Sequence, residues 1–359
     1  MKSVLFSSVQ AHSGKSAVCL GLGLNYRDKG RKVGYFKPLG IKFVGLSGAL
    51  VDEDAEQAKA TLKLEESLED ISPLVISPEL YGRALSKRED LSANVLKAFS
   101  KVSKGKDVLI IDGIEDFTAG RVIELSDLRV AEMLKSKILL VSTYDSMYVL
   151  DPVLSTVDLI RGQEKKSKRK ILAGIIFNQV RSGQREELKS TVIPFLEKQG
   201  IEVFGVLPRD RLLKSITVKD AAKDLNGEIL AGGEKSDRLI ESLLVGAMSP
   251  AHAMKYFRSR TSPAVVTGGD RSDIQLAALE ANVSCIILTG NLTPTAPILS
   301  RADELKIPII LVKDDTLSTV GRMEKLLTTV QVKGEQKMQR IISLVEENVN
   351  LKSLEKALS

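Results

Sequence analysis

The sequence predicts an α/β fold in which a parallel sheet carries helices on both faces and a second, smaller α/β domain follows. Two patterns support this prediction. Short β-rich apolar runs alternate with helical stretches over the first 200 residues, and a shorter series of the same kind begins after about residue 225. With 359 residues, of which 43% are hydrophobic, the chain can fill a core in each domain.

The first domain is predicted over residues 1–222. Its strands are expected at 4–6, 33–36, 108–111, 138–141 and 173–177. Helical patterns cover 16–30 and 91–102, and a further helix over 185–200 ends at Gly200, a typical C-terminal stop. Continuous apolar strands of this kind are typical of parallel sheets that are covered on both faces.

The second domain is predicted over residues 223–333. Its strands are expected at 264–266, 285–288 and 309–312, with helices at 272–282 and 295–306. We place the boundary within 223–237, which is rich in glycine and charge. Residues 334–359 should form a C-terminal amphipathic helix, because Met338, Ile341, Ile342, Val345 and Val349 have helix spacing. We expect this helix to dock on its parent domain, with a partner interface as the alternative.

Composition favours a cytoplasmic protein that handles anionic small molecules. The net charge is +6 and the pI is about 9.0. The basic run 165–170 lacks the aromatic residues of a single-strand nucleic-acid surface, so we interpret it as a solvated loop. Cys19 and Cys285 lie in apolar stretches and are expected to be buried thiols. The sequence has neither an apolar run of the roughly 18 residues that a membrane span needs nor a signal peptide, so we expect no membrane partner.

A candidate phosphate site lies between the first expected strand and the first helix. Ser13-Gly14-Lys15-Ser16 follows the turn that starts at Ser8, and the helix begins at Lys15. Backbone N–H groups and the helix dipole at such a junction favour an anion. Lys15 would reach the phosphates of a nucleotide, and the Ser16 hydroxyl would ligate Mg²⁺. Val9 replaces the first glycine of the usual pattern, but the loop keeps its amides.

Three further polar residues end expected strands of the same sheet. Lys37 ends "GYFK", Asp112 ends "DVLIID" and Asn178 ends "GIIFN". Ligands of open α/β sheets bind at this edge, so we expect these side chains to face the phosphate loop. Asp112 could hold the water of a metal ion, and the Asn178 amide could recognise the edge of an adenine. The alternative for Lys37 is an ordinary surface lysine.

The segments "SGKS", "YFKPLG", "IIDG", "FNQV" and "GVLPRDRLL" resemble the dethiobiotin synthetase family over roughly residues 1–215. These P-loop NTPase-type enzymes activate a carboxylated substrate with ATP. Similar domains make amides of corrin-ring carboxylates or form the amino-terminal part of long phosphotransacetylases. The resemblance implies the cofactors ATP and Mg²⁺. It assigns phosphate binding to Ser13, Gly14, Lys15 and Lys37, Mg²⁺ to Ser16, Asp54 and Asp112, the adenine to Asn178, and a loop beside the base to Pro208.

The chain departs from that family at two places. Ser8 stands where the family has a glycine, and the family's loop is one residue longer than the usual pattern. "DGIEDFTAG" replaces a glutamate and a glycine-rich turn that faces the substrate in the enzymes. These departures bear on the dethiobiotin reaction more than on nucleotide and Mg²⁺ binding.

A second candidate site lies in the second domain. Thr267-Gly268-Gly269-Asp270-Arg271 is a permuted form of the motif that names the DRTGG domain, and the segment 220–333 resembles that domain. Glycines could allow unusual backbone angles there, and Arg271 with the following helix start could face an anion. Thr289, Gly290 and Thr316 lie at neighbouring strand ends. The alternative, equally open, is a structural turn in which Asp273 only helps to start the helix.

Two functions remain as hypotheses. The first, slightly favoured, is a nucleotide-responsive regulatory module of acyl-phosphate or CoA metabolism that binds ATP in one domain and an anionic metabolite in the other. The second is an ATP-dependent ligase or amide-forming enzyme, for which His12 in the phosphate loop is the one nearby histidine. The long phosphotransacetylases carry a further transferase domain, so we expect no acetyl transfer by this chain. We expect no nucleic-acid partner, and a homo-oligomer is possible.

Overall fold

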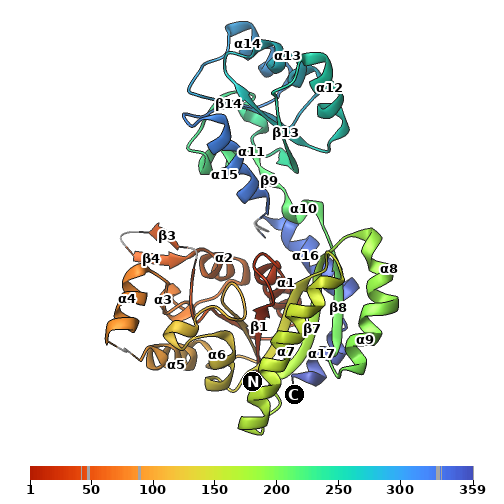
Figure 1. Ribbon diagram of the computed structural model, residues 1–359. Coiled ribbons are helices and arrows are strands. Elements are labelled where there is room, and N and C mark those ends of the chain that lie inside the picture. The colour runs from red at the N-terminus through yellow and green to blue at the C-terminus, as the bar shows by residue number, and fades with distance from the viewer. Residues whose placement is uncertain (42, 47–48, 88–89, 329–331, 333, 359) are drawn as a thin grey trace. The chain divides into compact units, whose positions relative to one another are not determined.

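The computed structural model describes residues 1–41, 43–46, 49–87, 90–328, 332 and 334–358. They form two compact units, the first made of residues 1–210 and 332–359 and the second of residues 211–331 (Figure 1). The first unit holds a six-stranded sheet with the order β2-β5-β1-β6-β7-β8, and all its neighbouring strands are parallel. This architecture confirms the predicted fold class.

The strands of this sheet contain all five expected runs. They are β1 (Lys2–Ser8), β2 (Val33–Phe36), β5 (Val108–Asp112), β6 (Lys137–Thr143), β7 (Leu172–Val180) and β8 (Val203–Pro208). Of these, β8 is not among the expected strands, although it contains the "GVLP" part of the family-like segment "GVLPRDRLL". Because every strand runs in the same direction, their carboxyl ends share one edge of the sheet.

Helices cover both faces of the sheet. On one face, α5 (Ser92–Val102), α6 (Asp127–Met133), α7 (Leu150–Ser167) and the helical segment 185–198 contribute to one apolar cluster, which includes Leu5, Leu109 and Leu140 of the strands. On the other face, α1 (Lys15–Asp28) and α2 (Glu53–Leu62) pack together, and a Cβ on Gly23 would lie 3.0 Å from Leu62 and 3.2 Å from Ile110. This second face carries the helix that begins at the phosphate loop.

Shorter elements complete the first unit. They are the hairpin β3 (Phe43–Leu46) and β4 (Ala49–Asp52), α3 (Leu68–Ile71), and α4 (Pro78–Lys87). Asp52 ends β4 and caps α2, since its Oδ1 accepts a hydrogen bond from Ala55 N at 3.0 Å. This cap fixes the start of the helix whose first turn carries Asp54.

The second unit is an α/β domain with a five-stranded sheet. Its strands are β12 (Ser242–Val245), β13 (Pro263–Gly268), β14 (Cys285–Thr289), β15 (Ile309–Leu311) and β10 (Glu228–Ala231), in the order β10-β15-β14-β13-β12. Only β10 is antiparallel to its neighbour. Its helices include the short α10 (Arg211–Lys214) and the longer α11 (Val218–Asp224), α12 (Pro250–Ser259), α13 (Ser272–Glu280), α14 (Ala296–Leu305) and α15 (Thr316–Thr328).

The segment 223–237, in which we expected the domain boundary, lies inside the second unit. It contains β10, whose Ile229 pairs with Ile310 of β15. Two of its glycines lie in close contact with neighbours: a Cβ on Gly227 would lie 2.6 Å from Ile310, and one on Gly232, which has a φ of 63°, would lie 2.5 Å from Ile307. The second unit already begins at Arg211, twelve residues before the expected start at 223.

The tail forms two helices, α16 (Glu335–Asn348) and α17 (Leu351–Ala357), and it belongs to the first unit. The break falls at Val349, which is extended and bridges to Gly205, while Asn350 N donates to Phe204 O at 2.7 Å. Asn350 then caps α17 through a hydrogen bond from Ser353 N. The expected single helix is therefore interrupted, because its backbone turns aside to bond with β8.

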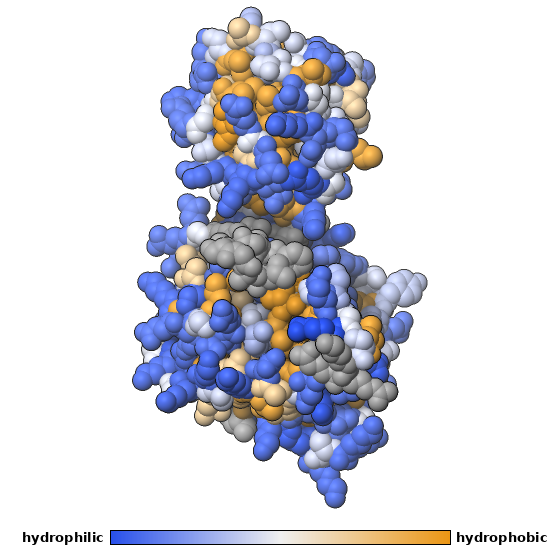
Figure 2. Space-filling view, turned by 90° about the vertical axis from the view of Figure 1, so that its left-hand side faces the viewer, coloured by the Kyte–Doolittle hydropathy of each residue, from blue (hydrophilic) through white to orange (hydrophobic). Residues whose placement is uncertain are grey.

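Hydrophilic side chains dominate the visible surface, and apolar ones gather in smaller areas of each unit (Figure 2). Among the described residues, no helix combines the length and apolar character that crossing a membrane requires. Cys19 and Cys285 are free and buried, as expected. The basic run 165–170 is largely exposed at the end of α7 and in the loop before β7.

Candidate functional site

The phosphate loop connects β1 to α1 and is closed by its own side chains. Ser8 Oγ and Ser13 Oγ lie 2.8 Å apart, so a hydroxyl pair joins the two ends of the loop. Gln10 fastens the middle of the loop to β6, because its Nε2 donates to Thr143 Oγ1 at 2.6 Å and its Oε1 accepts from Ser142 Oγ at 3.0 Å. The loop is thus organised although it lacks the first glycine of the usual pattern.

Gly14 precedes α1 and satisfies two requirements at once. Its φ is 77°, in the left-handed region that favours glycine. A Cβ at this position would also lie 2.5 Å from Nδ2 of Asn178. Glycine is therefore needed both for the turn into the helix and for the close approach of β7. His12, which has a φ of 59°, is exposed.

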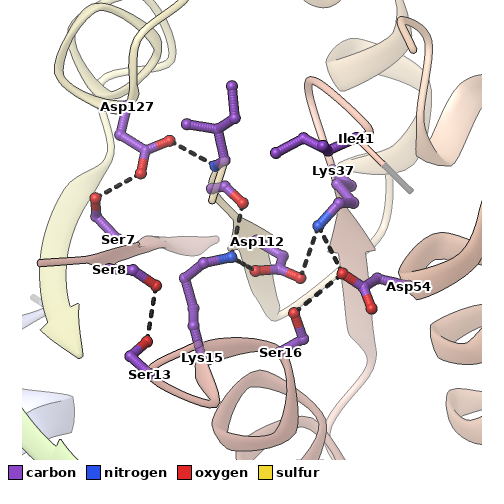
Figure 3. Close-up of polar contacts among 12 residues, drawn as sticks. Ser7, Ser8, Ser13, Lys15, Ser16, Lys37, Ile41, Asp54, Asp112 and Asp127 are labelled. Atoms are coloured by element: carbon purple, nitrogen blue, oxygen red, sulfur yellow. Dashed lines mark hydrogen bonds and ion pairs between the residues drawn. The ribbon is translucent and has the colours of Figure 1, made fainter. Parts of the chain in front are cut away.

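Two buried lysines and two carboxylates meet at the sheet edge (Figure 3). Lys15 Nζ forms an ion pair with Asp112 Oδ1 and donates to Gly113 O at 2.7 Å. Lys37 Nζ lies 3.2 Å from Asp54 Oδ2 and 3.3 Å from Asp112 Oδ2. Lys37 is thus not a surface lysine: its side chain is only 4% exposed. The two ammonium groups are held by the same carboxylate.

The charges of this cluster stabilise one another. Burial alone would raise the pKa of Asp112, but Lys15 and Lys37 outweigh it and hold that pKa below its usual range. Burial would lower the pKa of Lys37, and the carboxylates of Asp112 and Asp54 instead keep it well above its usual value. Burial and Asp112 raise the pKa of Tyr35, which donates to Asp112 Oδ2 at 2.6 Å. The cluster therefore holds the charged Lys37 ammonium beside the ionised carboxylate of Asp112.

The three residues expected to hold Mg²⁺ lie around the same point. Ser16 Oγ donates to Asp54 Oδ2 at 3.3 Å, and Asp54 and Asp112 are both bonded to Lys37. Carboxylate and hydroxyl oxygens are hard donors of the kind that Mg²⁺ prefers, so this set fits the ion. The described residues contain no cluster of three or more His, Cys, Asp or Glu side chains that could hold a metal by themselves. Other oxygens, from water or phosphate, would have to complete such a site.

The residues expected near the base lie at the ends of β7 and β8. Asn178 is 8% exposed, and its Nδ2 donates to Ser13 O at 2.9 Å. Pro208 pairs with Val180 in the sheet, and Arg209 N donates to Val180 O at 2.9 Å. The structure thus brings both residues to the edge that carries the phosphate loop, but the Asn178 nitrogen bonds to the loop itself.

Two residues at this edge were missed by sequence reasoning. Asp127 is buried at the start of α6, where it accepts from Ser7 Oγ and from Ile114 N, and burial raises its pKa to about 7. Gln179 donates from Nε2 to His12 O at 3.0 Å. In the sequence, Asp127 resembles an ordinary helix-start residue and Gln179 an ordinary strand residue. Only the fold shows that one is enclosed and the other is turned toward the loop.

In the second unit, the glycine pair serves packing rather than unusual angles. Neither Gly268 nor Gly269 has a positive φ. A Cβ on Gly269 would lie 1.7 Å from Leu292 O, so the loop that follows β14 packs directly against this glycine. A Cβ on Gly268 would lie 2.5 Å from Asp270 Oδ1. The expectation of special backbone angles was wrong here, because close approach of a neighbouring chain segment explains these glycines.

The other expected residues of this second site lie at neighbouring strand ends. Gly268 pairs with Thr289 in the sheet, and Thr289 Oγ1 lies 2.8 Å from Thr316 Oγ1. Gly290 has a φ of 76°, so it is the glycine that uses the left-handed region. Arg271 is paired with Asp273, with Nε 3.0 Å from Asp273 Oδ1, and it also donates to Met248 O. Its guanidinium thus has a carboxylate partner on its own helix.

Comparisons with known proteins match both units. The model of the family described as AAA domain matches residues 2–217, and the DRTGG domain model matches residues 220–326. Phosphate acetyltransferases of Synechocystis sp. and Nitratidesulfovibrio vulgaris are 24% and 25% identical over 97% and 98% of this chain. The chain spans about half the length of these relatives, 50% and 51%.

Parts of this chain also match solved structures. Cobyrinic acid a,c-diamide synthase from Mycobacterium smegmatis is 14% identical, with 58% of this chain and 86% of that chain covered and a TM-score of 0.37. The regulatory region of Clostridium perfringens pyrophosphatase, with CBS and DRTGG domains, is 23% identical, with 33% and 49% covered and a TM-score of 0.28. The resemblance inferred from the sequence motifs is confirmed by the family models and relatives.

Proposed function

Because the chain belongs to the AAA domain family through residues 2–217, we propose that its first unit binds ATP with Mg²⁺ and that its DRTGG unit senses an anionic metabolite. The chain would then be a nucleotide-responsive regulatory module of acyl-phosphate or CoA metabolism. The observation that carries this proposal is the convergence of Lys15 and Lys37 on Asp112 at the start of α1. Two desolvated cations at a helix start favour a polyphosphate.

The ion pairs of the cluster make Mg²⁺ part of this proposal. Without a ligand, Asp112 and Asp54 neutralise both lysines. A polyphosphate that takes the lysines would leave these carboxylates beside its own negative charge. Mg²⁺ held by Ser16, Asp54 and Asp112 would offset the charge of carboxylates and phosphates together. We therefore expect nucleotide affinity to depend strongly on Mg²⁺.

Adenine selectivity is a further part of the proposal. Asn178, two residues before the end of β7, and Pro208, the last residue of β8, lie on neighbouring strands at this edge. The Asn178 nitrogen is bonded to Ser13 O, so its contribution to the base would come from Oδ1. That oxygen can accept from the exocyclic amine of adenine, whereas guanine presents a carbonyl oxygen at the corresponding position. ATP should therefore bind more tightly than GTP.

An ATP-dependent ligase or amide-forming enzyme remains the second candidate. It is favoured by Lys37, because a second buried cation beside the phosphate loop could stabilise a phosphoryl group during transfer to a carboxylate. The regulatory function is favoured by "DGIEDFTAG", which replaces the substrate-facing turn of the resembling enzymes. Phosphate release from ATP, with and without small carboxylic acids, separates the two candidates.

Calorimetric titration with ATP, ADP and GTP, each with and without Mg²⁺, tests the nucleotide site. Lys15→Ala should weaken ATP binding by about tenfold or more, because a charge-assisted hydrogen bond contributes about 1.5–3 kcal/mol. Lys29→Ala, at the exposed far end of the same helix, is the matched control and should change nothing. Equal ATP affinity in folded Lys15→Ala and in the unaltered protein would refute the proposal.

A further inference from the structure

The end of β7 is irregular where it meets the phosphate loop. Between the pairs Phe177–Val206 and Val180–Pro208, two residues of β7 stand opposite one residue of β8, which is a β-bulge. Gln179, the second bulge residue, has a φ of 60°. Consecutive side chains of a regular strand point to opposite faces. The bulge instead allows the amides of Asn178 and Gln179 to reach the same loop.

These two amides bond to consecutive carbonyls of the loop. Gln179 Nε2 donates to His12 O at 3.0 Å, and Asn178 Nδ2 donates to Ser13 O at 2.9 Å and to Gly14 O at 3.4 Å. In a trans peptide, the carbonyl and the following N–H point in opposite directions. Bonding these carbonyls to β7 therefore turns the N–H groups of the next residues, Ser13 to Lys15, away from β7.

We propose that Asn178 and Gln179 form an amide clamp that holds the phosphate loop in its anion-binding conformation, irrespective of the base of the ligand. In the usual pattern, the first glycine allows the loop to adopt its conformation. Here that glycine is missing, and hydrogen bonds from β7 hold the loop in place instead. The left-handed φ of Gln179 supports this role, because such strained positions persist where the surrounding structure requires them. Both residues are positioning residues in this proposal.

This inference rests on the proposed phosphate site, and a ligand without a base tests it. We would titrate Mg²⁺-tripolyphosphate, Mg²⁺-ATP and Mg²⁺-GTP into the full chain and into two variants. Gln179→Gly removes the amide but accepts the same backbone angle, and Asn178→Leu removes the other donor at similar size. Gln199→Ala, at an exposed glutamine just after α9 (Ile193–Lys198), is the control.

The clamp predicts that Gln179→Gly weakens the binding of all three ligands by the same factor. This factor is about tenfold if the loss of loop order costs as much free energy as one hydrogen bond contributes. Its preference for ATP over GTP should stay unchanged. Asn178→Leu should also weaken tripolyphosphate. The opposing outcome is that Asn178→Leu lowers ATP affinity while tripolyphosphate binding stays intact. In that case Asn178 contributes only to recognition of the base, and the clamp is refuted. Unchanged affinities in Gln179→Gly would overturn it as well.

Hydrogen exchange without ligand separates the clamp from the proposed function. Val9 N donates to Val141 O at 3.1 Å and Val18 N to Gly14 O at 3.2 Å, so these amides report the order of the loop and of the helix start. Exchange over residues 8–20 should be faster in both variants than in the unaltered protein and the control. If no polyphosphate binds but exchange rises, the nucleotide proposal fails and the clamp stands. Unchanged exchange in both variants refutes the clamp.

Discussion

The hydroxyl groups of Ser8 and Ser13 lie 2.8 Å apart and join the two ends of the phosphate loop. Both residues are buried, with 2% and 1% of their surfaces exposed. A buried hydroxyl that loses its partner costs about 1–3 kcal/mol, more than the net value of the bond itself. This pair therefore contributes to loop order and to the stability of the first unit.

The Ser8–Ser13 pair can be measured with a double-mutant cycle. Ser8→Ala and Ser13→Ala should each lower the free energy of unfolding by about 1–3 kcal/mol. The double variant should lose less than the sum, because neither hydroxyl is then left alone. Denaturant unfolding of the four proteins gives the coupling energy, and exposed Ser155→Ala provides the control. Strictly additive losses would show that the two hydroxyls do not interact in solution.

The edge of the first sheet that carries the site could be predicted from the sequence. Lys37, Asp112 and Asn178 each end an apolar run, and parallel strands place such ends on one edge. The partners of these residues could not be predicted. That Asp112 is shared by Lys15 and Lys37, and that Asn178 bonds to the loop, depends on strand order and on the bulge in β7.

In the second unit, the glycines were the least reliable guide to structure among the sequence patterns. Gly227, Gly232, Gly268 and Gly269 indicated a linker and a special turn; each allows another chain segment or side chain to approach closely, and of the four only Gly232 has a positive φ, at 63°. We expect a boundary within 223–237 because the segment is rich in glycine and charge, but its few apolar residues form a short strand at the sheet edge. Local composition does not distinguish a linker from an edge strand.

Because of Asp127, the free energy of unfolding should fall as the pH rises toward neutrality. Burial raises its pKa from 3.8 to about 7, and Asp112 adds to this, while Lys15, Ser7 and Ile114 act in the opposite direction. A carboxyl whose pKa is raised by folding contributes stability that is complete below its unfolded pKa. That contribution is lost as the pH rises from about 4 to about 7. The loss is on the order of 4 kcal/mol at most, at about 1.4 kcal/mol per pH unit.

Asp127→Asn tests this dependence. The variant should lack the decline between pH 4 and 7 and should be more stable than the unaltered protein above pH 7, because it cannot ionise. Urea unfolding at several pH values measures both effects, and exposed Asp158→Asn on α7 is the control. Asp112 acts in a separate window, since its lowered pKa means that its stabilisation is lost only in acid. Parallel stability curves for Asp127→Asn and the unaltered protein would contradict the assignment.

Arg271 is expected to bind the anionic ligand of the second unit. In the full chain carrying Lys15→Ala, in which nucleotide binding at the first site is weakened, adenine nucleotides, CoA esters and acyl phosphates can be screened by thermal shift. A ligand at 100 times its Kd adds about 2.7 kcal/mol to stability. Arg271→Ala should abolish the ligand-induced rise in melting temperature, whereas Arg301→Ala on α14 should not. Asp273→Asn should enhance it, because Asp273 now occupies the Arg271 guanidinium.

The regulatory proposal requires the two sites to influence each other. A ligand that binds through Arg271 should change ATP affinity at the first site by about 1–3 kcal/mol, and ATP should change the affinity of that ligand equally. If no compound shifts the melting temperature and Arg271→Ala leaves ATP binding untouched, the motif is a structural turn. The second unit would then be better interpreted as an assembly surface.

The contact between α1 and α16 leads to the last prediction, which compares two helical glycines. A Cβ on Gly21 would lie 2.7 Å from Ile341 and 2.9 Å from Val345 of α16, whereas a Cβ on Gly162 of α7 would meet nothing within 4 Å. Gly21→Ala should therefore destabilise the protein by about 1–3 kcal/mol through overpacking. Gly162→Ala should stabilise it by up to about 1 kcal/mol, because alanine favours the helix. Thermal and denaturant unfolding of both variants tests whether the two substitutions change the free energy of unfolding in opposite directions. Equal stability of the two variants would mean that α16 does not rest on α1 as closely as the structure describes.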